Sequence, residues 1–306
     1  MVDTAEAFRG TLTGEVLLDW LSALRSAESS EGNDILVGSQ DPDQIAGEGG
    51  NDLVLGLAGN DSLYGDAAAE DWVPLPPDEV PPGGDDLILG GAGTDSIWGG
   101  MGSDTILGGG GDDQIFGGVD VRKMGLSATN THDAADLLLG GAGNDTIAAG
   151  GGDDTLRGGQ GDDVLTGNQG VDRISGGAGA DTFVFGTPRD YHKPILGTDL
   201  DTGVGQGNRD VITDFTQGED IINIAQITYL NARAGHPYEF IGTDAFTGGE
   251  GGFIRYEVQG DHTIVQIDVA PPDTSVPSDG VVDAEIELVG VHALTATDFE
   301  QYNLIG

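Results

Sequence analysis

A nine-residue repeat runs through much of this chain and limits the folds it can adopt more than any other feature. From about residue 29 to 185 the pattern is G-G-x-G-x-D-x-U-x, in which U is a large apolar residue. Well-formed copies are GGAGTDSIW (90–98), GGMGSDTIL (99–107) and GGAGNDTIA (140–148). A strict period of nine excludes a collagen repeat and is too regular for a glycine-rich linker. We therefore expect a repeat fold in which each copy contributes one small unit.

Fourteen copies can be aligned, and two of their nine positions keep the same chemical character throughout. The sixth position is always aspartate: Asp34, Asp43, Asp52, Asp61, Asp86, Asp95, Asp104, Asp113, Asp136, Asp145, Asp154, Asp163, Asp172 and Asp181. The eighth position is always apolar: Leu36, Ile45, Val54, Leu63, Ile88, Ile97, Ile106, Ile115, Leu138, Ile147, Leu156, Leu165, Ile174 and Phe183. The aspartate is expected to supply one carboxylate to the loop of each copy, and the apolar residue is expected to point into the core.

The charge balance calls for a cation. The chain has 53 acidic residues against 11 Lys plus Arg, a formal net charge of −42, so it repels itself until its carboxylates are neutralised. A polyanion of this strength argues against nucleic acid or an anionic membrane as the partner. Cysteine is absent, which removes thiolate sites, and carboxylates with glycine-rich carbonyls are hard oxygen donors that suit calcium better than zinc or copper. No stretch approaches 18 consecutive apolar residues, so membrane insertion is not expected.

These repeats resemble those of the RTX family of secreted bacterial proteins, the haemolysin-type calcium-binding repeats. The resemblance implies an all-β fold, a parallel β-roll in which the six-residue loop holds calcium and the x-U-x triplet is a short strand. Two copies would make one turn, so fourteen predict seven turns and a rod of about 33 Å. Calcium ions would lie between loops one turn apart, with the fourteen sixth-position aspartates as ligands. Roughly eight ions are expected if each insertion breaks the stack and roughly twelve if the stack is continuous.

Three regions are expected. Residues 1–28 form an N-terminal helical cap, since Thr13 can cap a helix whose apolar residues recur at helical spacing. Residues 29–186 form the roll, with insertions at 65–80 and 117–130, and residues 187–306 form a C-terminal capping region. Both insertions enlarge loops on one edge of the roll. Surface elaboration is the favoured interpretation, over a small cleft or lid whose most distinctive side chains are Trp72, Arg122 and Lys123.

The outward positions of the two predicted sheets differ in character. The odd-numbered repeats present a long apolar face, and the N-terminal helix is a candidate cover for it. The apolar positions of this face are Ile35, Val37, Leu53, Leu55, Leu87, Leu89, Leu107, Leu137 and Leu139. The even-numbered repeats carry Tyr64, Trp98 and Phe116 one turn apart. This aromatic ladder is a candidate polysaccharide platform, and packing under an insertion or against another chain is the alternative that we favour.

The region after the repeats also resembles a known group. The segments RDVITDFTQGEDIINI (209–224) and IELVGVHALTATDF (286–299) are similar to the C-terminal region of serralysin-type RTX exoproteins. That resemblance implies a cap on the roll and an uncleaved signal read by a type I secretion apparatus. It would explain why the N-terminus has no Sec-type signal peptide, and it places the protein outside the cell. Strands are expected at 252–258, 262–269 and 283–291, and Asp199, Asp201 and Asp220 are candidate further calcium ligands.

Catalytic motifs are missing from the sequence. None of the five histidines belongs to an HExxH zinc motif, and there is no G-x-S-x-G nucleophile elbow. We therefore expect a non-enzymatic calcium-binding protein that folds on binding extracellular Ca²⁺ and acts as a matrix, adhesion or polysaccharide- or surface-binding factor. The alternative is an accessory calcium-binding and secretion module of an RTX exoenzyme of the metalloprotease, lipase or epimerase type.

Overall fold

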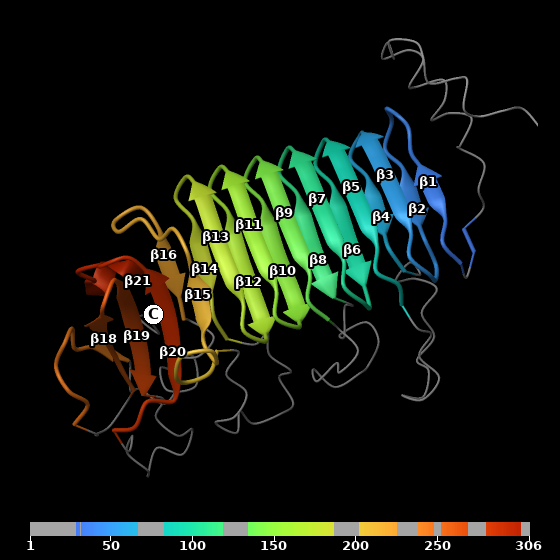
Figure 1. Cartoon of the computed structure of the whole chain (residues 1–306). Helices are drawn as coiled ribbons and strands as arrows, with labels where there is room; N and C mark the ends of the chain where they lie inside the picture. The colour runs from blue at the N-terminus through green and yellow to red at the C-terminus, as the bar shows by residue number, and fades with distance from the viewer. Residues whose placement is uncertain are drawn as a thin grey trace, which may run out of the picture.

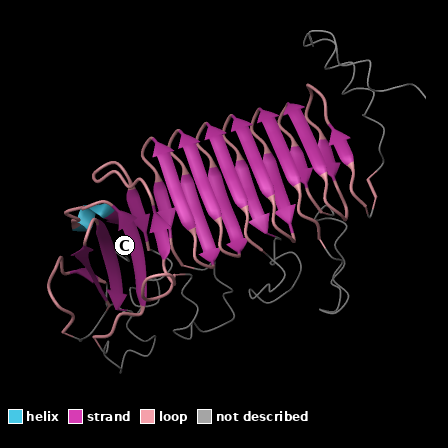
Figure 2. Cartoon of the chain, in the orientation of Figure 1, coloured by secondary structure: helices cyan, strands magenta, loops and turns pink. Residues whose placement is uncertain are grey.

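The computed structural model describes residues 29–30, 32–66, 83–118, 134–186, 202–224, 238–247, 252–268 and 280–300. These residues form an elongated stack of parallel strands that ends in a C-terminal β region (Figure 1). Figure 2 shows that strands dominate, with one short 3-10 helix, η2 (Ala296–Asp298). The predicted all-β parallel roll is confirmed. The predicted N-terminal helix lies outside the described residues, as do most of both insertions.

Each repeat contributes one strand, and successive strands alternate between two sheets. The odd-numbered repeats form β1 (Ile35–Val37), β3 (Leu53–Ala58), β5 (Leu87–Ala92), β7 (Thr105–Gly110), β9 (Leu137–Ala142), β11 (Thr155–Gln160) and β13 (Arg173–Ala178). The even-numbered repeats form β2 (Gln44–Ala46), β4 (Ser62–Tyr64), β6 (Ser96–Gly100), β8 (Gln114–Gly118), β10 (Thr146–Gly151), β12 (Val164–Gln169) and β14 (Thr182–Val184). Two repeats therefore make one turn, as predicted.

The insertions do not break the stack. Strands β5 and β7 pair in parallel with Ile88 opposite Ile106, a separation of one regular turn. The same pairing joins Val54 to Ile88 across the first insertion and Ile106 to Leu138 across the second. Since the insertions lie between β4 and β5 and between β8 and β9, both leave from one edge of the roll.

Many strands are longer than the predicted triplet because the parallel ladder continues through the first glycines of the next repeat. Gly91 pairs with Gly109, for example, in β5 and β7. Gly91 has a φ of 114°, and a Cβ atom there would collide with the carbonyl oxygen of Leu57 one turn earlier. The close approach of successive turns therefore requires glycine at this position.

The eighth-position residues form one continuous core between the two sheets. Twelve of the fourteen are no more than 1% exposed. Leu36 is 7% exposed and Ile45 is only partly buried. Both belong to the first turn, which has a neighbouring turn on one side only. The predicted core is confirmed, and the first turn forms its less buried end.

The roll is longer than the seven turns expected from the repeats. Strands β15 (Asp210–Ile212) and β16 (Ile221–Asn223) pair in parallel with β13 and β14 and add an eighth layer. Strands β20 (Ala284–Val289) and β21 (Phe299–Glu300) add a ninth. The reason is that apolar residues at the core register continue after the glycine loops end: Ile212 and Leu288 follow Ile174, and Ile222 and Phe299 follow Phe183.

Beyond the ninth layer, the odd-numbered sheet turns antiparallel. Strand β19 (His262–Asp268) pairs with β20 and with β18 (Phe253–Gln259), and β17 (Glu239–Phe240) forms the edge. The three strands expected at 252–258, 262–269 and 283–291 are therefore confirmed. Among the residues described, no helix has the length and hydrophobicity needed to cross a bilayer.

The apolar face predicted for the odd-numbered sheet is present on the outside of the roll. Ile35 is 44% exposed, Leu87 40% and Leu137 36%, although each belongs to a strand whose central residue is buried. The other predicted residues of this face are half-buried, apart from Val37, which is buried. Whether residues 1–28 cover this face stays a prediction.

Candidate metal sites along two aspartate ladders

All fourteen predicted aspartates occupy equivalent places, just before a strand, and they form one ladder along each edge of the roll. The backbone N–H of each aspartate donates a hydrogen bond to Oδ1 of the aspartate one turn further on. The bond from Asp86 to Asp104 is 2.9 Å long, and the one from Asp113 to Asp145 is 2.8 Å. All fourteen such bonds measure 2.7–3.0 Å.

The second carboxylate oxygen faces a backbone carbonyl across a glycine. A Cβ atom placed on Gly90 would lie 2.5 Å from Oδ2 of Asp95 and 2.6 Å from the carbonyl oxygen of Gly108. Oxygens from two successive turns thus converge where a side chain would otherwise be. The same arrangement recurs at Gly38, Gly47, Gly56, Gly65, Gly99, Gly108, Gly117, Gly140 and Gly158. Such oxygen cradles present the hard donors that calcium prefers.

These carboxylate oxygens are buried without compensation. Oδ2 has no hydrogen-bond partner among the described residues in Asp52, Asp61, Asp86, Asp95, Asp113, Asp145 and Asp163. Buried carboxylates need a paired charge or a coordinated cation. Nowhere in the described ranges do three His, Cys, Asp or Glu side chains gather at one point. Each cradle instead pairs one carboxylate oxygen with one backbone carbonyl oxygen. The residues present fit calcium, which accepts six to eight oxygen ligands of mixed type.

Burial changes the protonation of the ladders. It raises the pKa of Asp86, Asp113 and Asp163 from 3.8 to about 7, and neighbouring carboxylates add to the rise. The pKa of Asp181 rises to about 6 for the same reasons. A bound cation would remove this penalty because it stabilises the charged form.

Two further aspartates extend the ladders beyond the repeats. Oδ1 of Asp210 accepts the N–H of Asp172 at 2.8 Å, and Oδ1 of Asp220 accepts the N–H of Asp181 at 3.0 Å. Asp220 was a candidate ligand on sequence grounds, whereas Asp210 was missed. The signal was present, because both aspartates stand two residues before a core residue, as in every repeat. Asp199 and Asp201 lie outside the described residues.

The predicted aromatic ladder is present on the outer face of the even-numbered sheet. The rings of Tyr64 and Trp98 stack with centroids 4.8 Å apart and an angle of 7°, and Trp98 and Phe116 stack at 5.4 Å and 13°. Ring faces are therefore turned toward one another along the sheet. An approaching ligand would meet mainly ring edges. The insertion side chains Trp72, Arg122 and Lys123 lie outside the described residues.

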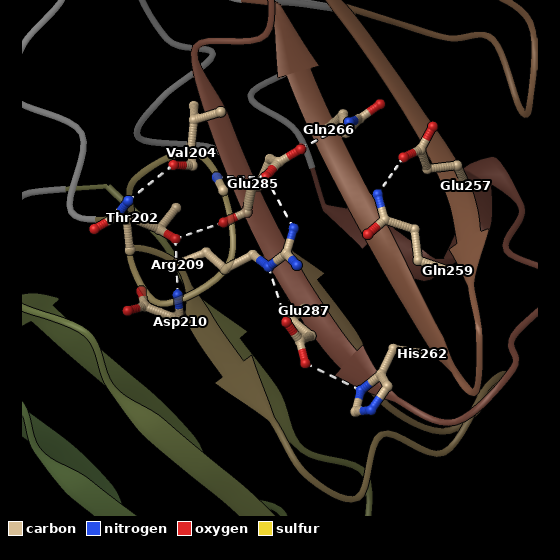
Figure 3. Close-up of polar contacts among 12 residues, drawn as sticks. Thr202, Val204, Arg209, Asp210, Glu257, Gln259, His262, Gln266, Glu285 and Glu287 are labelled. Carbon is tan, nitrogen blue, oxygen red and sulfur yellow. Dashed lines mark hydrogen bonds and ion pairs between the residues drawn. The ribbon is translucent and has the colours of Figure 1, made fainter.

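A second polar cluster joins the last layers of the fold (Figure 3). Arg209 is 6% exposed, and its guanidinium pairs with Glu285 at 2.9 Å and Glu287 at 2.8 Å. Glu285 also accepts a hydrogen bond from Gln266 at 2.7 Å, and Glu287 lies 3.0 Å from Nδ1 of His262. Because Arg209 directly precedes β15 and both glutamates are on β20, the cluster links the eighth layer to the ninth.

The comparison with protein families agrees with the repeat pattern. The family of the RTX calcium-binding nonapeptide repeat matches in four copies, at residues 28–68, 83–115, 131–165 and 149–183. No curated protein matches the chain significantly. The matches do not extend to the C-terminal region, whose resemblance to serralysin-type proteins stays a prediction.

Solved structures with detectable similarity include two subunits of the mannuronan C5-epimerase from Azotobacter vinelandii. Its R3 subunit is 25% identical, with 71% of this chain and 80% of that chain covered and a TM-score of 0.26. Its R2 subunit is 22% identical, with 66% and 95% covered and a TM-score of 0.27. The extracellular lipase LipA from Serratia marcescens is 17% identical, with 90% of this chain and 39% of the lipase covered and a TM-score of 0.19. On the repeat matches and the ladder geometry, the repeat region of this chain belongs to the RTX family of calcium-binding nonapeptide repeats.

Proposed function

We propose that this protein is an extracellular calcium-binding factor whose folding depends on calcium. The observation that carries the proposal is the recurring oxygen cradle, in which a buried aspartate Oδ2 and a carbonyl oxygen of the next turn face one point. The fourteen sixth-position aspartates are the proposed ligands. Since the ladders run unbroken across both insertions, we favour the larger of the two ion counts, roughly twelve.

Electrostatics explains why folding would be coupled to calcium binding. The chain carries a formal charge of −42, and the roll packs its carboxylates into two rows one turn apart. Without a cation these rows repel, whereas calcium binds only the folded arrangement and therefore stabilises it. Extracellular calcium modules have dissociation constants of about 10⁻⁴ to 10⁻³ M, so the chain would stay unfolded in the cytosol and fold outside. This supports export through a type I apparatus, with the signal in residues 187–306.

The proposed role outside the cell is non-enzymatic. In this proposal residues 29–186 are the rod and residues 187–306 its cap, while the helix expected at residues 1–28 lies outside the described residues. Such a rod suits a matrix, adhesion or surface-binding factor. The alternative is an accessory module of an exoenzyme; hydrolase or epimerase activity in the purified protein would favour it.

The proposal is tested by titrating calcium into EDTA-stripped protein while recording far-UV circular dichroism and tryptophan fluorescence. A cooperative transition from coil to β structure is expected with calcium and not with magnesium, which retains its water and demands octahedral geometry. A chain that is fully folded before calcium is added would overturn the proposal.

The aromatic ladder supports a second candidate function, binding of a polysaccharide by the even-numbered sheet. Tyr64, Trp98 and Phe116 are half-buried and stack into an apolar strip of the kind that packs against sugar C–H groups. Replacing all three by alanine should abolish retention on immobilised glycans. The matched control replaces Ser62, Ser96 and Gln114, which lie on the same strands. Equal retention by the two triple variants would remove this candidate.

A further inference from the structure

The root of the first insertion holds a buried carboxylate that does not belong to the repeat pattern. Asp66 occupies the second position of its repeat, where Gly100 stands one turn further on. It is 7% exposed. Its Oδ2 accepts the backbone N–H of Met101 at 2.8 Å, while its Oδ1 is buried and has no hydrogen-bond partner among the described residues.

Asp66 forms an oxygen cradle of its own. A Cβ atom placed on Gly83, at the far root of the insertion, would lie 2.6 Å from Oδ2 of Asp66 and would collide with the carbonyl oxygen of Met101. The pair resembles a ladder cradle in that a carboxylate oxygen and a carbonyl oxygen of the next turn face one glycine, but here the carboxylate oxygen, Oδ2, also accepts the N–H of Met101. Gly110 occupies the same position of its repeat, and a Cβ atom there would meet nothing within 4 Å. The second cradle is therefore a property of this loop and not of the repeat.

The charge around Asp66 is unusually high and has no protein counter-charge nearby in sequence. Burial, with a smaller contribution from the carboxylates of Asp52 and Glu48, raises the pKa of Asp66 to about 6, although the backbone N–H groups of Met101 and Gly84 oppose the rise. Burial is the main cause of the raised pKa of Asp86, and among the neighbouring carboxylates Asp66 raises it most. Between Arg25 and Arg122 the chain contains no lysine, arginine or histidine. A solute cation is the available neutraliser.

We infer that Asp66 and the carbonyl oxygen of Met101 add ligands to the calcium position at the root of the first insertion, where Oδ2 of Asp86 and the carbonyl oxygen of Gly99 already face Gly65. Calcium affinity increases with the number of charged ligands. A regular position draws its charge from the ladder aspartates alone, whereas Asp66 adds one more carboxylate here. The site is the tightest in the roll and fills first, and it ties Asp66 at one end of the insertion to Gly83 at the other.

The inference rests on the proposed calcium-dependent folding and is tested with three variants of the full chain. Asp66→Asn keeps the shape of the side chain and removes its charge. Asp66→Gly restores the glycine usual at this repeat position. Asp85→Asn is the matched control: it removes one charge from the same loop, and asparagine at the equivalent positions 33 and 60 accepts the hydrogen bond that Asp85 accepts from Ser103.

Terbium is a suitable probe because Tyr64 lies two residues before Asp66, and Trp98 two residues before Gly100, so both can sensitise its emission. The EDTA-stripped proteins are titrated with Tb³⁺, and the emission is then displaced with Ca²⁺. We expect the tightest step to weaken about tenfold in both Asp66 variants and to be unchanged in Asp85→Asn. Circular dichroism in saturating Ca²⁺ verifies that each variant folds.

The outcomes separate the two claims. If the wild-type chain binds neither ion, the proposed function itself fails. If the wild-type chain binds and folds but both Asp66 variants keep its tightest step, the proposed function stands and the role of Asp66 as an added ligand is refuted. An equal weakening in Asp85→Asn would likewise refute it, because the effect would then be one of net charge.

Discussion

At the scale of single residues, the two carboxylate oxygens of each ladder aspartate have different roles. Oδ1 accepts a backbone N–H from the preceding turn and so sets the loop, while Oδ2 faces a carbonyl oxygen across a glycine. The first contact survives replacement by asparagine, since an amide oxygen also accepts a hydrogen bond. The second requires negative charge. Replacing a ladder aspartate by asparagine therefore separates the hydrogen-bonding role of Oδ1 from the charge that Oδ2 supplies.

Asp95→Asn should weaken calcium binding without disrupting the loop. Oδ1 of Asp95 accepts the N–H of Asp61 at 2.9 Å, and the amide oxygen can keep this bond. We expect the midpoint of the calcium titration to rise severalfold because one ladder charge is lost. Asp112→Asn is the control, since Asp112 accepts a comparable bond from Asn144 at 2.8 Å outside the buried ladder. Equal midpoints in the two variants would contradict the assigned role.

The raised pKa values predict how pH acts on the calcium-free protein. The pKa of Asp86, Asp113 and Asp163 is about 7 in the fold against 3.8 as the ordinary value. The calcium-free fold therefore binds more protons than the unfolded chain between about pH 4 and pH 7, and its stability falls as the pH rises through this window. The destabilisation is complete above pH 7 and absent below pH 4.

We accordingly expect more β structure in calcium-free protein at pH 5.5 than at pH 7.5 by circular dichroism. Calcium should also bind more weakly at pH 5.5, because protons compete for the same carboxylates. Calcium-free β content that is independent of pH, or that rises toward pH 7.5, would show that these aspartates are not buried as described.

At the scale of elements, the ion-paired cluster of Arg209 is a polar link between the roll and its C-terminal strands. Arg209 precedes β15, and its partners Glu285 and Glu287 belong to β20 (Figure 3). Strand β19 contributes Gln266 and His262 to the same cluster. Such a cluster stabilises the fold only when all its charged members are present. Removing one member leaves buried charge without compensation.

Arg209→Ala should destabilise the C-terminal strands by about 3 kcal/mol, because the buried carboxylate of Glu285 and the half-buried one of Glu287 lose their partner. Hydrogen exchange in saturating calcium should show faster exchange in β19 and β20 and little change in β5 to β11. Arg157→Ala provides the comparison, since Arg157 is an exposed arginine on the same sheet. Similar exchange in the two variants would mean that the cluster does not hold the layers together.

At the scale of the whole molecule, what the sequence could predict depended on how regular the loops are. The fourteen aspartates and fourteen apolar residues were predicted because each copy repeats the same chemistry at the same spacing. Asp210 was missed because its glycine loop is gone, although its aspartate and core residue keep the repeat spacing. Asp66 was not predicted as a ligand, because it occupies the second position of the repeat, where the pattern has glycine. The ninth layer was beyond prediction because β20 joins from more than 70 residues further along the chain.

The central claim, that calcium turns an expanded polyanion into a rod, is tested most directly by small-angle X-ray scattering of the full chain with and without calcium. An unfolded chain of 306 residues has a radius of gyration of about 60 Å, and a compact one about 19 Å. The account predicts a value close to the unfolded limit in EDTA and one well under half of it, with the profile of a short rod, in millimolar calcium. The same rod-like profile in both solutions would contradict it.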